Sequence, residues 1–144
     1  NQFGHYFFVG LNSNERRKGP GAKGELGSVQ RHELKEALDD IYEIDKEAKI
    51  IIYLHHYPFK FKLELPGPFD EDNMRLVDKK KFLKLIKNRV HGLFFGHVHK
   101  YKRFIDEESK LGINIIQCDA KATHNGSDIK FSEINLESCQ IQRI

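Results

Sequence analysis

The sequence predicts an α/β protein in which a layered sheet has helices outside it. Three apolar runs, at 6–11, 50–54 and 92–95, have the length of buried strands and alternate with two amphipathic segments. This alternation of strand and helix favours a layered architecture. Histidines directly follow the second and third runs, at the strand ends where open α/β sheets bind their ligands.

The first strand, 6–11, is followed by a glycine-rich stretch that predicts a loop over 15–27. Ser28 is expected to cap a helix over 29–44, because a serine hydroxyl can accept a hydrogen bond from an N–H group of the first helical turn. The apolar residues at helical spacing in this segment are Leu34, Ala37, Leu38, Ile41 and Ile44. The opposite face is charged, which indicates a helix lying on a sheet.

Strand 50–54 leads into a proline-containing loop over 57–74, and a second amphipathic helix is expected over 76–88. Loops as long as 57–74 are often functional. After strand 92–95 the pattern changes to short β-like segments separated by turn-forming residues, which predicts an antiparallel meander. These segments lie at 100–106, 112–118, 128–136 and 139–144.

Composition excludes several classes of protein. The chain has 144 residues, the length of one domain or of a large piece of one, and its net charge of +3 is too small to indicate a nucleic-acid partner. It contains no run of 18 apolar residues, so we expect no membrane partner. Cys118 and Cys139 form no Cys-x-x-Cys pair; a reduced intracellular pair is expected, with one disulfide as the alternative. We therefore expect a cytoplasmic protein.

Two histidine motifs carry the functional prediction. Gly96-His97-Val98-His99 follows strand 92–95, and His55-His56-Tyr57-Pro58 follows strand 50–54. Imidazole nitrogens bind metals such as zinc, iron and manganese, and side chains two residues apart on a strand point to the same side. The two motifs therefore predict a metal site at the sheet edge, whereas buried structural histidines are the alternative.

With these motifs in this order, the chain resembles the C-terminal half of the calcineurin-like metallophosphoesterases, a superfamily that includes purple acid phosphatases and phosphodiesterases. The family's later motifs are an apolar strand ending in His-x-Pro and another ending in Gly-His-x-His, and both are present here. The segment 7–13 is also similar to a family strand that ends in Leu-Asp-Ser. The resemblance implies a layered α/β/β/α sandwich, with 1–144 as the C-terminal part of a single domain.

The resemblance also implies roles for individual residues. His56 and His97 match ligands of the second metal, and His99 matches a ligand of the first. His55 is assigned a catalytic role in contact with substrate, with a half-buried strand-end histidine as the alternative. The implied cofactors are two divalent or trivalent ions (Mn, Fe or Zn). The implied reaction is hydrolysis of a phosphomonoester or phosphodiester at a binuclear metal centre.

The family's early motifs, Asp-x-His, Gly-Asp and Gly-Asn-His, do not occur in the sequence. We therefore expect an incomplete fragment that is inactive alone, with the missing N-terminal half of the same domain as its partner. Without that half, strand 6–11 or 50–54 is expected to present an unpaired edge or face. The alternatives are a catalytically inactive interaction scaffold of the same fold, and an α/β domain with incidental histidines.

Overall fold

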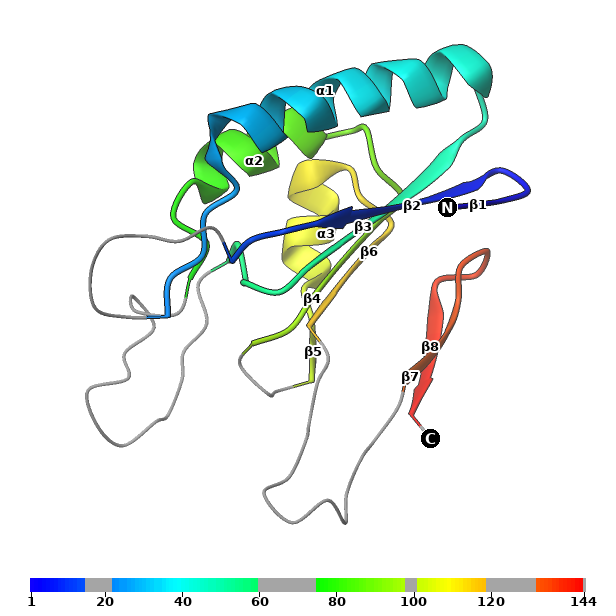
Figure 1. Ribbon diagram of the computed structural model, residues 1–144. Coiled ribbons are helices and arrows are strands. Elements are labelled where there is room, and N and C mark those ends of the chain that lie inside the picture. The colour runs from blue at the N-terminus through cyan, green and yellow to red at the C-terminus, as the bar shows by residue number, and fades with distance from the viewer. Residues whose placement is uncertain (15–21, 60–74, 98–100, 119–131, 144) are drawn as a thin grey trace.

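The computed structural model describes residues 1–14, 22–59, 75–97, 101–118 and 132–143, and within them the chain has a mixed α/β architecture (Figure 1). The elements in chain order are β1 (Gln2–Phe3), β2 (Tyr6–Leu11), α1 (Gly27–Ile44), β3 (Lys49–Leu54), α2 (Lys79–Ile86), β4 (Gly92–Phe95), β5 (Lys102–Arg103), α3 (Ile105–Leu111), β6 (Ile115–Cys118), β7 (Ser132–Asn135) and β8 (Gln140–Arg143). They form a six-stranded sheet and a separate two-stranded sheet. The predicted α/β class is confirmed.

The larger sheet has the strand order β1-β2-β3-β4-β6-β5. Its four inner strands are parallel, and the short edge strands β1 and β5 pair antiparallel to their neighbours. Leu11 of β2 is opposite Leu54 of β3, which in turn is opposite Phe95 of β4. The carboxyl ends of the three strands are therefore aligned. The residues that follow them lie next to one another at one edge of the sheet.

The strands expected at 6–11, 50–54 and 92–95 are confirmed as β2, β3 and β4. The expectation of an unpaired edge is wrong for β3, because β2 and β4 pair with it on its two sides. On its outer side, β2 pairs with β1 through Tyr6 and Phe7. Consecutive apolar residues in β3 are buried because this strand lies inside the sheet.

Helix α1 begins at Gly27, and Ser28 is not its cap. Instead, the carboxylate of Asp78 accepts hydrogen bonds from the backbone N–H groups of Leu26 and Gly27, each at 3.2 Å, and also pairs with Arg31. A carboxylate at this position accepts from N–H groups at the start of the helix, which have no partner within the helix. Because Asp78 is distant in sequence, the local pattern around Ser28 could not indicate it.

Helix α2 is shorter than the predicted 76–88. Leu76 pairs with Gly24 in an isolated bridge, the N–H of Val77 donates to the Gly24 carbonyl at 2.8 Å, and residues 77–78 form a turn before the helix begins at Lys79. After the helix, Asn88 adopts a left-handed conformation with φ of 58°. In the described part of the chain, no helix combines the length and apolar character needed to cross a lipid bilayer.

The antiparallel pairing predicted after β4 is confirmed for β5 with β6, but the prediction of a simple meander is wrong. β6 runs parallel to β4, and α3 occupies a stretch that the sequence indicated as a turn. Glu108 explains the difference: it is buried, binds the Arg103 guanidinium at 2.8 Å and accepts the N–H of Ile116 at 2.8 Å. A charged residue thus ties α3 to β5 and β6. The later segments do form an antiparallel hairpin, β7–β8.

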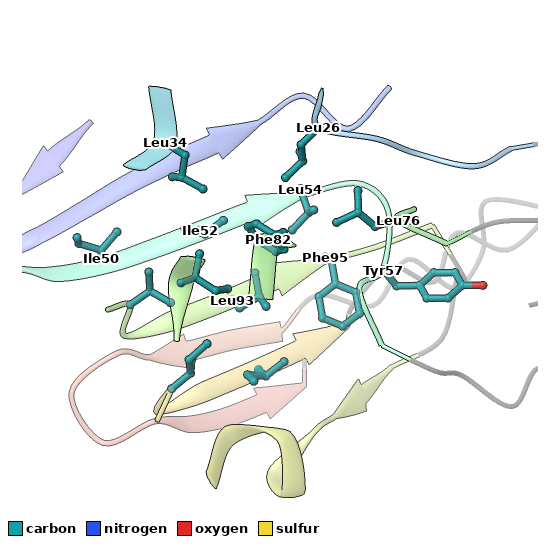
Figure 2. Packing of buried hydrophobic residues seen from close by; sticks show 14 of the residues in the cluster. Leu26, Leu34, Ile50, Ile52, Leu54, Tyr57, Leu76, Phe82, Leu93 and Phe95 are labelled. Atoms are coloured by element: carbon teal, nitrogen blue, oxygen red, sulfur yellow. The ribbon is translucent and has the colours of Figure 1, made fainter. Parts of the chain in front are cut away.

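The core lies between the sheet and the helices α1 and α2. Leu34 of α1 and Phe82 of α2 pack with Ile50, Ile52 and Leu93 in one buried cluster, and Figure 2 shows these side chains gathered beside β3 and β4. Burying side chains of this size stabilises a fold by about 1.5–3 kcal/mol each. The core therefore fixes β3 and β4, the two strands that carry the histidine motifs.

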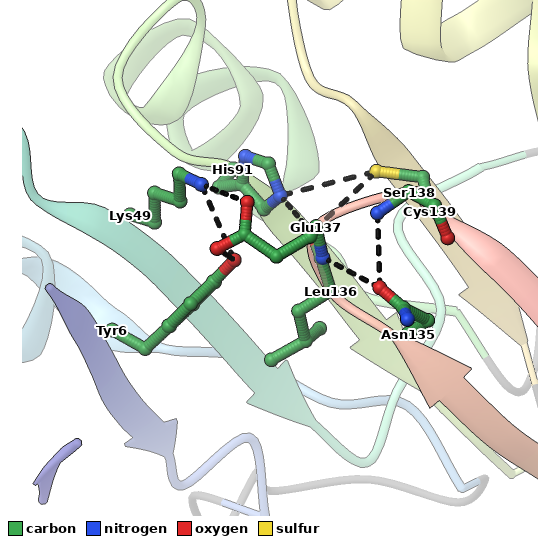
Figure 3. A network of polar contacts seen from close by, with 8 residues as sticks. All are labelled: Tyr6, Lys49, His91, Asn135, Leu136, Glu137, Ser138 and Cys139. Atoms are coloured by element: carbon green, nitrogen blue, oxygen red, sulfur yellow. Dashed lines mark hydrogen bonds and ion pairs between the residues drawn. The ribbon is translucent and has the colours of Figure 1, made fainter. Parts of the chain in front are cut away.

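A polar network holds the β7–β8 hairpin against the face of the sheet opposite to α1 and α2 (Figures 1 and 3). Glu137 accepts hydrogen bonds from the Tyr6 hydroxyl at 2.7 Å and from the Lys49 ammonium at 2.8 Å. The His91 Nε2–H donates to the Leu136 carbonyl at 2.8 Å. The bond to Lys49 is the main cause that lowers the pKa of Glu137. The network is at the amino ends of β2 and β3, away from the histidine motifs.

Glu137→Gln is expected to loosen the hairpin, because it removes the charged partner of Lys49. The folded-state pKa of Glu137 lies below its unfolded value, so its stabilisation is present above that unfolded value and is lost as the pH falls through the folded one. NMR measures this effect as amide protection factors in 132–135 and 140–142. In wild type these factors should fall between neutral and acid pH. In the variant they should already be lower than in wild type at neutral pH. Glu133→Gln, in the same hairpin, is the control. Equal protection in wild type and Glu137→Gln would contradict this role.

Candidate metal centre

The two histidine motifs lie side by side at the carboxyl edge of the sheet. β3 ends at Leu54 and is followed by His55 and His56, while β4 ends at Phe95 and is followed by Gly96 and His97. The N–H of Gly96 donates to the His55 carbonyl at 3.1 Å, which continues the pairing of the strands beyond their ends. Backbone pairing thus sets the relative position of the two motifs.

The three imidazole rings of His55, His56 and His97 contact one another. Their ring centroids are 4.5 Å apart for His55 and His97, 4.7 Å for His56 and His97, and 4.9 Å for His55 and His56. One ring nitrogen from each residue lies within 4.8 Å of the others. His56 is buried, His97 is half-buried and His55 is exposed, so the cluster extends from the interior to the surface.

The turn after β4 falls on His97 itself. His97 has φ of 72°, in the left-handed region that non-glycine residues rarely adopt, whereas Gly96 has no positive φ. The predicted alternation of strand side chains therefore does not apply here, because β4 ends at Phe95. Unfavourable backbone conformations of this kind occur often at functional sites.

Both ring nitrogens of His56 have protein partners. Nε2 lies 3.0 Å from the Ala22 carbonyl, and Nδ1 lies 2.9 Å from the Ser13 hydroxyl oxygen. Since a carbonyl can only accept, Nε2 carries the proton and Nδ1 accepts from Ser13. The Ser13 oxygen also accepts the backbone N–H of His56 at 3.1 Å. This set of bonds fixes the ring orientation and its tautomer.

The surroundings of His56 favour its neutral form. Burial lowers its pKa below the ordinary value of 6.5, and the charge of neighbouring His55 lowers it further. A neutral imidazole is the form that binds metal ions. His56 is therefore in the protonation state of a ligand at pH 7.

Two chain segments, around Ser13 and around Gly24, cover His56, and isolated backbone bridges join them to each other and to residues 75–76. Asn14 pairs with Glu25, Gly24 with Leu76, and Tyr57 with Arg75. Gly24 lies so close to His56 that an added Cβ would be 2.2 Å from Nδ1 and 2.6 Å from the Ser13 carbonyl oxygen. This contact requires glycine at position 24, and the covering segments account for the burial of His56.

The structure brings together His56 and His97, which the sequence predicted as ligands; the ligand role itself stays a prediction. His55, predicted to contact substrate, has its ring in the same cluster. His99 lies outside the described residues, as does most of the loop predicted over 57–74. The histidines at 5 and 91 lie elsewhere, bonded to Asp45 and to the Leu136 carbonyl.

Sequence reasoning missed Ser13, Ala22 and Gly24. Ser13 had a usable signal, because it follows β2, the neighbour of β3, at the same sheet edge as the histidines. Ala22 acts through its backbone carbonyl and Gly24 through close packing, so neither carries a recognisable residue pattern.

Comparisons with known proteins do not identify a family for this chain. No family model matches it, and no curated protein sequence matches it. The resemblance to metallophosphoesterases therefore stays a prediction from the sequence motifs.

Gly24→Ala is expected to destabilise the fold by about 1–3 kcal/mol, the usual cost of forcing atoms into a packed site. It should also shift the NMR signals of the His56 ring, which has to move away from the new methyl group. Gly4→Ala is the control: its Cβ would meet no atom within 4 Å, although its φ of 57° is unfavourable for alanine. Unchanged His56 signals in Gly24→Ala would contradict the described packing.

Proposed function

We propose that this chain forms the histidine-bearing part of a metal-dependent phosphoesterase that hydrolyses a phosphomonoester or phosphodiester. The observation that carries the proposal is the convergence of His56 and His97 at the ends of two adjacent parallel strands. Imidazoles placed at the carboxyl edge of an open α/β sheet are well positioned to hold a metal ion beside a substrate.

The residues present fit a metal ion in their donor chemistry. His56 is neutral and oriented by its neighbours, and His97 and His55 bring further imidazoles to it. In the proposal, His56, His97 and His99 hold ions of the manganese, iron or zinc type. When bound, such ions draw charge from phosphoryl oxygens and make water more acidic. His55 is exposed beside these ligands and, in the proposal, its ring N–H donates to a phosphoryl oxygen of the substrate.

A binuclear centre also requires carboxylates. Within the residues that the structure describes, no Asp or Glu joins the histidine cluster. In the proposal these ligands come from an N-terminal half of the same domain. The position of the β7–β8 hairpin, on the sheet face opposite to α1 and α2, supports a four-layer α/β/β/α sandwich in which the hairpin belongs to the second sheet.

The test is hydrolysis of p-nitrophenyl phosphate and of bis-p-nitrophenyl phosphate with added Mn²⁺. The 144-residue chain is expected to hydrolyse neither, because it lacks the early carboxylate motifs. The complete polypeptide that contains both halves is expected to hydrolyse at least one. In that polypeptide, His97→Ala should lower kcat/KM at least about 100-fold, the effect expected on losing a metal ligand.

His32→Ala is the matched control, because His32 is an exposed residue of α1 whose imidazole pairs with Glu36. Histidine-dependent turnover by the 144-residue chain would show that the proposed ligand set is wrong. If the complete polypeptide bound metal but hydrolysed neither ester, the inactive interaction scaffold would replace the enzyme as the best account.

A further inference from the structure

We propose that His55 is a metal ligand, and that His55, His56 and His97 together bind one divalent ion of the zinc type. The inference uses the same histidine cluster as the proposed function, but it requires neither phosphoester hydrolysis nor any carboxylate. It also changes the role of His55, which the sequence indicated as a substrate contact.

The spacing of the three imidazole rings is compatible with one shared metal ion. The three ring centroids form a nearly equilateral triangle with sides of 4.5, 4.7 and 4.9 Å, and the potential ligand nitrogens lie within 4.8 Å of one another. Zinc–nitrogen bonds of about 2.0–2.1 Å in a tetrahedral shell place neighbouring nitrogens about 3.3 Å apart. The nitrogens therefore have to approach one another by at most about 1.5 Å, through rotation of the His55 and His97 rings about their side-chain bonds.

The hydrogen bonds of His56 identify its ligand atom. Nε2–H donates to the Ala22 carbonyl, so ligation through Nε2 would require loss of that bond and a change of tautomer. Nδ1 already holds the lone pair, and an ion there requires the Ser13 hydroxyl, 2.9 Å away, to move aside while the bond to Ala22 is kept. A ligand histidine whose second ring nitrogen donates to a carbonyl is the usual arrangement at metal sites.

The donor set defines the class of ion. Three imidazoles with no carboxylate among the described neighbours suit zinc, cobalt, nickel or copper, and disfavour magnesium and calcium. Three protein ligands leave a fourth position, which is the pattern of zinc sites that also bind water or another ligand. Because His55 is exposed, this position faces the surface.

Calorimetric titration of the chain with Zn²⁺ tests the ligand set. We expect one ion per chain, no comparable binding of Mg²⁺, and an affinity that falls at least about tenfold in His55→Phe and in His97→Phe. Phenylalanine keeps the ring packing and removes the nitrogens. His32→Phe, at an exposed position of α1 where the imidazole pairs with Glu36, is the matched control and should change the affinity less than threefold. Absence of Zn²⁺ binding up to millimolar concentration, or dependence on His99 but not on His55, would overturn the inference.

NMR of the histidine side-chain nitrogens tests the ligand atom. Without metal, at a pH where His56 is neutral, its proton is expected on Nε2, and added Zn²⁺ should shift Nδ1. Ser13→Ala, but not the control Ser28→Ala, should mix the two tautomers. A proton on Nδ1 in the wild type, or Zn²⁺ bound at Nε2, would overturn this assignment.

The two proposals fail differently. If Zn²⁺ binding depends on His55 and the complete polypeptide hydrolyses no phosphate ester, the phosphoesterase proposal fails and the three-histidine site stands. If hydrolysis requires His97 and His99 while the Zn²⁺ affinity does not change in His55→Phe, the three-histidine site fails and the phosphoesterase proposal stands.

Discussion

The pairing of β3 with β4 is the interaction on which the candidate site depends. Leu54 lies opposite Phe95, and the N–H of Gly96 extends the pairing to the His55 carbonyl. A slip of one residue in this register would turn every side chain of the strand to the other face of the sheet and separate His97 from the other imidazoles. The hydrophobic core beneath both strands prevents such a slip, because it would expose buried side chains.

The two edges of the sheet serve different purposes. At the amino ends of β2 and β3, Tyr6, Lys49 and Glu137 hold the hairpin through charged and polar contacts that reach solvent. At the carboxyl ends, the segments around Ser13 and Gly24 close over His56 and remove it from water. Burial of a polar ring is unfavourable unless its nitrogens are bonded, and the bonds to His56 satisfy this requirement. The contacts that hold the hairpin and the contacts that bury His56 thus lie at opposite ends of the strands.

The sequence was sufficient where local pattern and fold agree. The buried strands and the histidines that follow them in the sequence could be predicted, because apolar runs of this length occupy the inner strands of a sheet. It was insufficient where distant residues decide local structure. Asp78 caps α1 in place of Ser28, and Glu108 anchors a helix within a stretch of charged residues typical of a turn. The left-handed conformation of His97 has no sequence signal, since glycine rather than histidine is the usual residue in that conformation.

Diffraction from zinc-soaked crystals of the chain, recorded at the zinc absorption edge, tests the central claim directly. The account predicts an anomalous peak bounded by the rings of His55, His56 and His97, with Nδ1 of His56 facing it and the Ala22 carbonyl still bonded to Nε2. A peak coordinated without His55, or bound zinc located away from the carboxyl edge of β3 and β4, would contradict it.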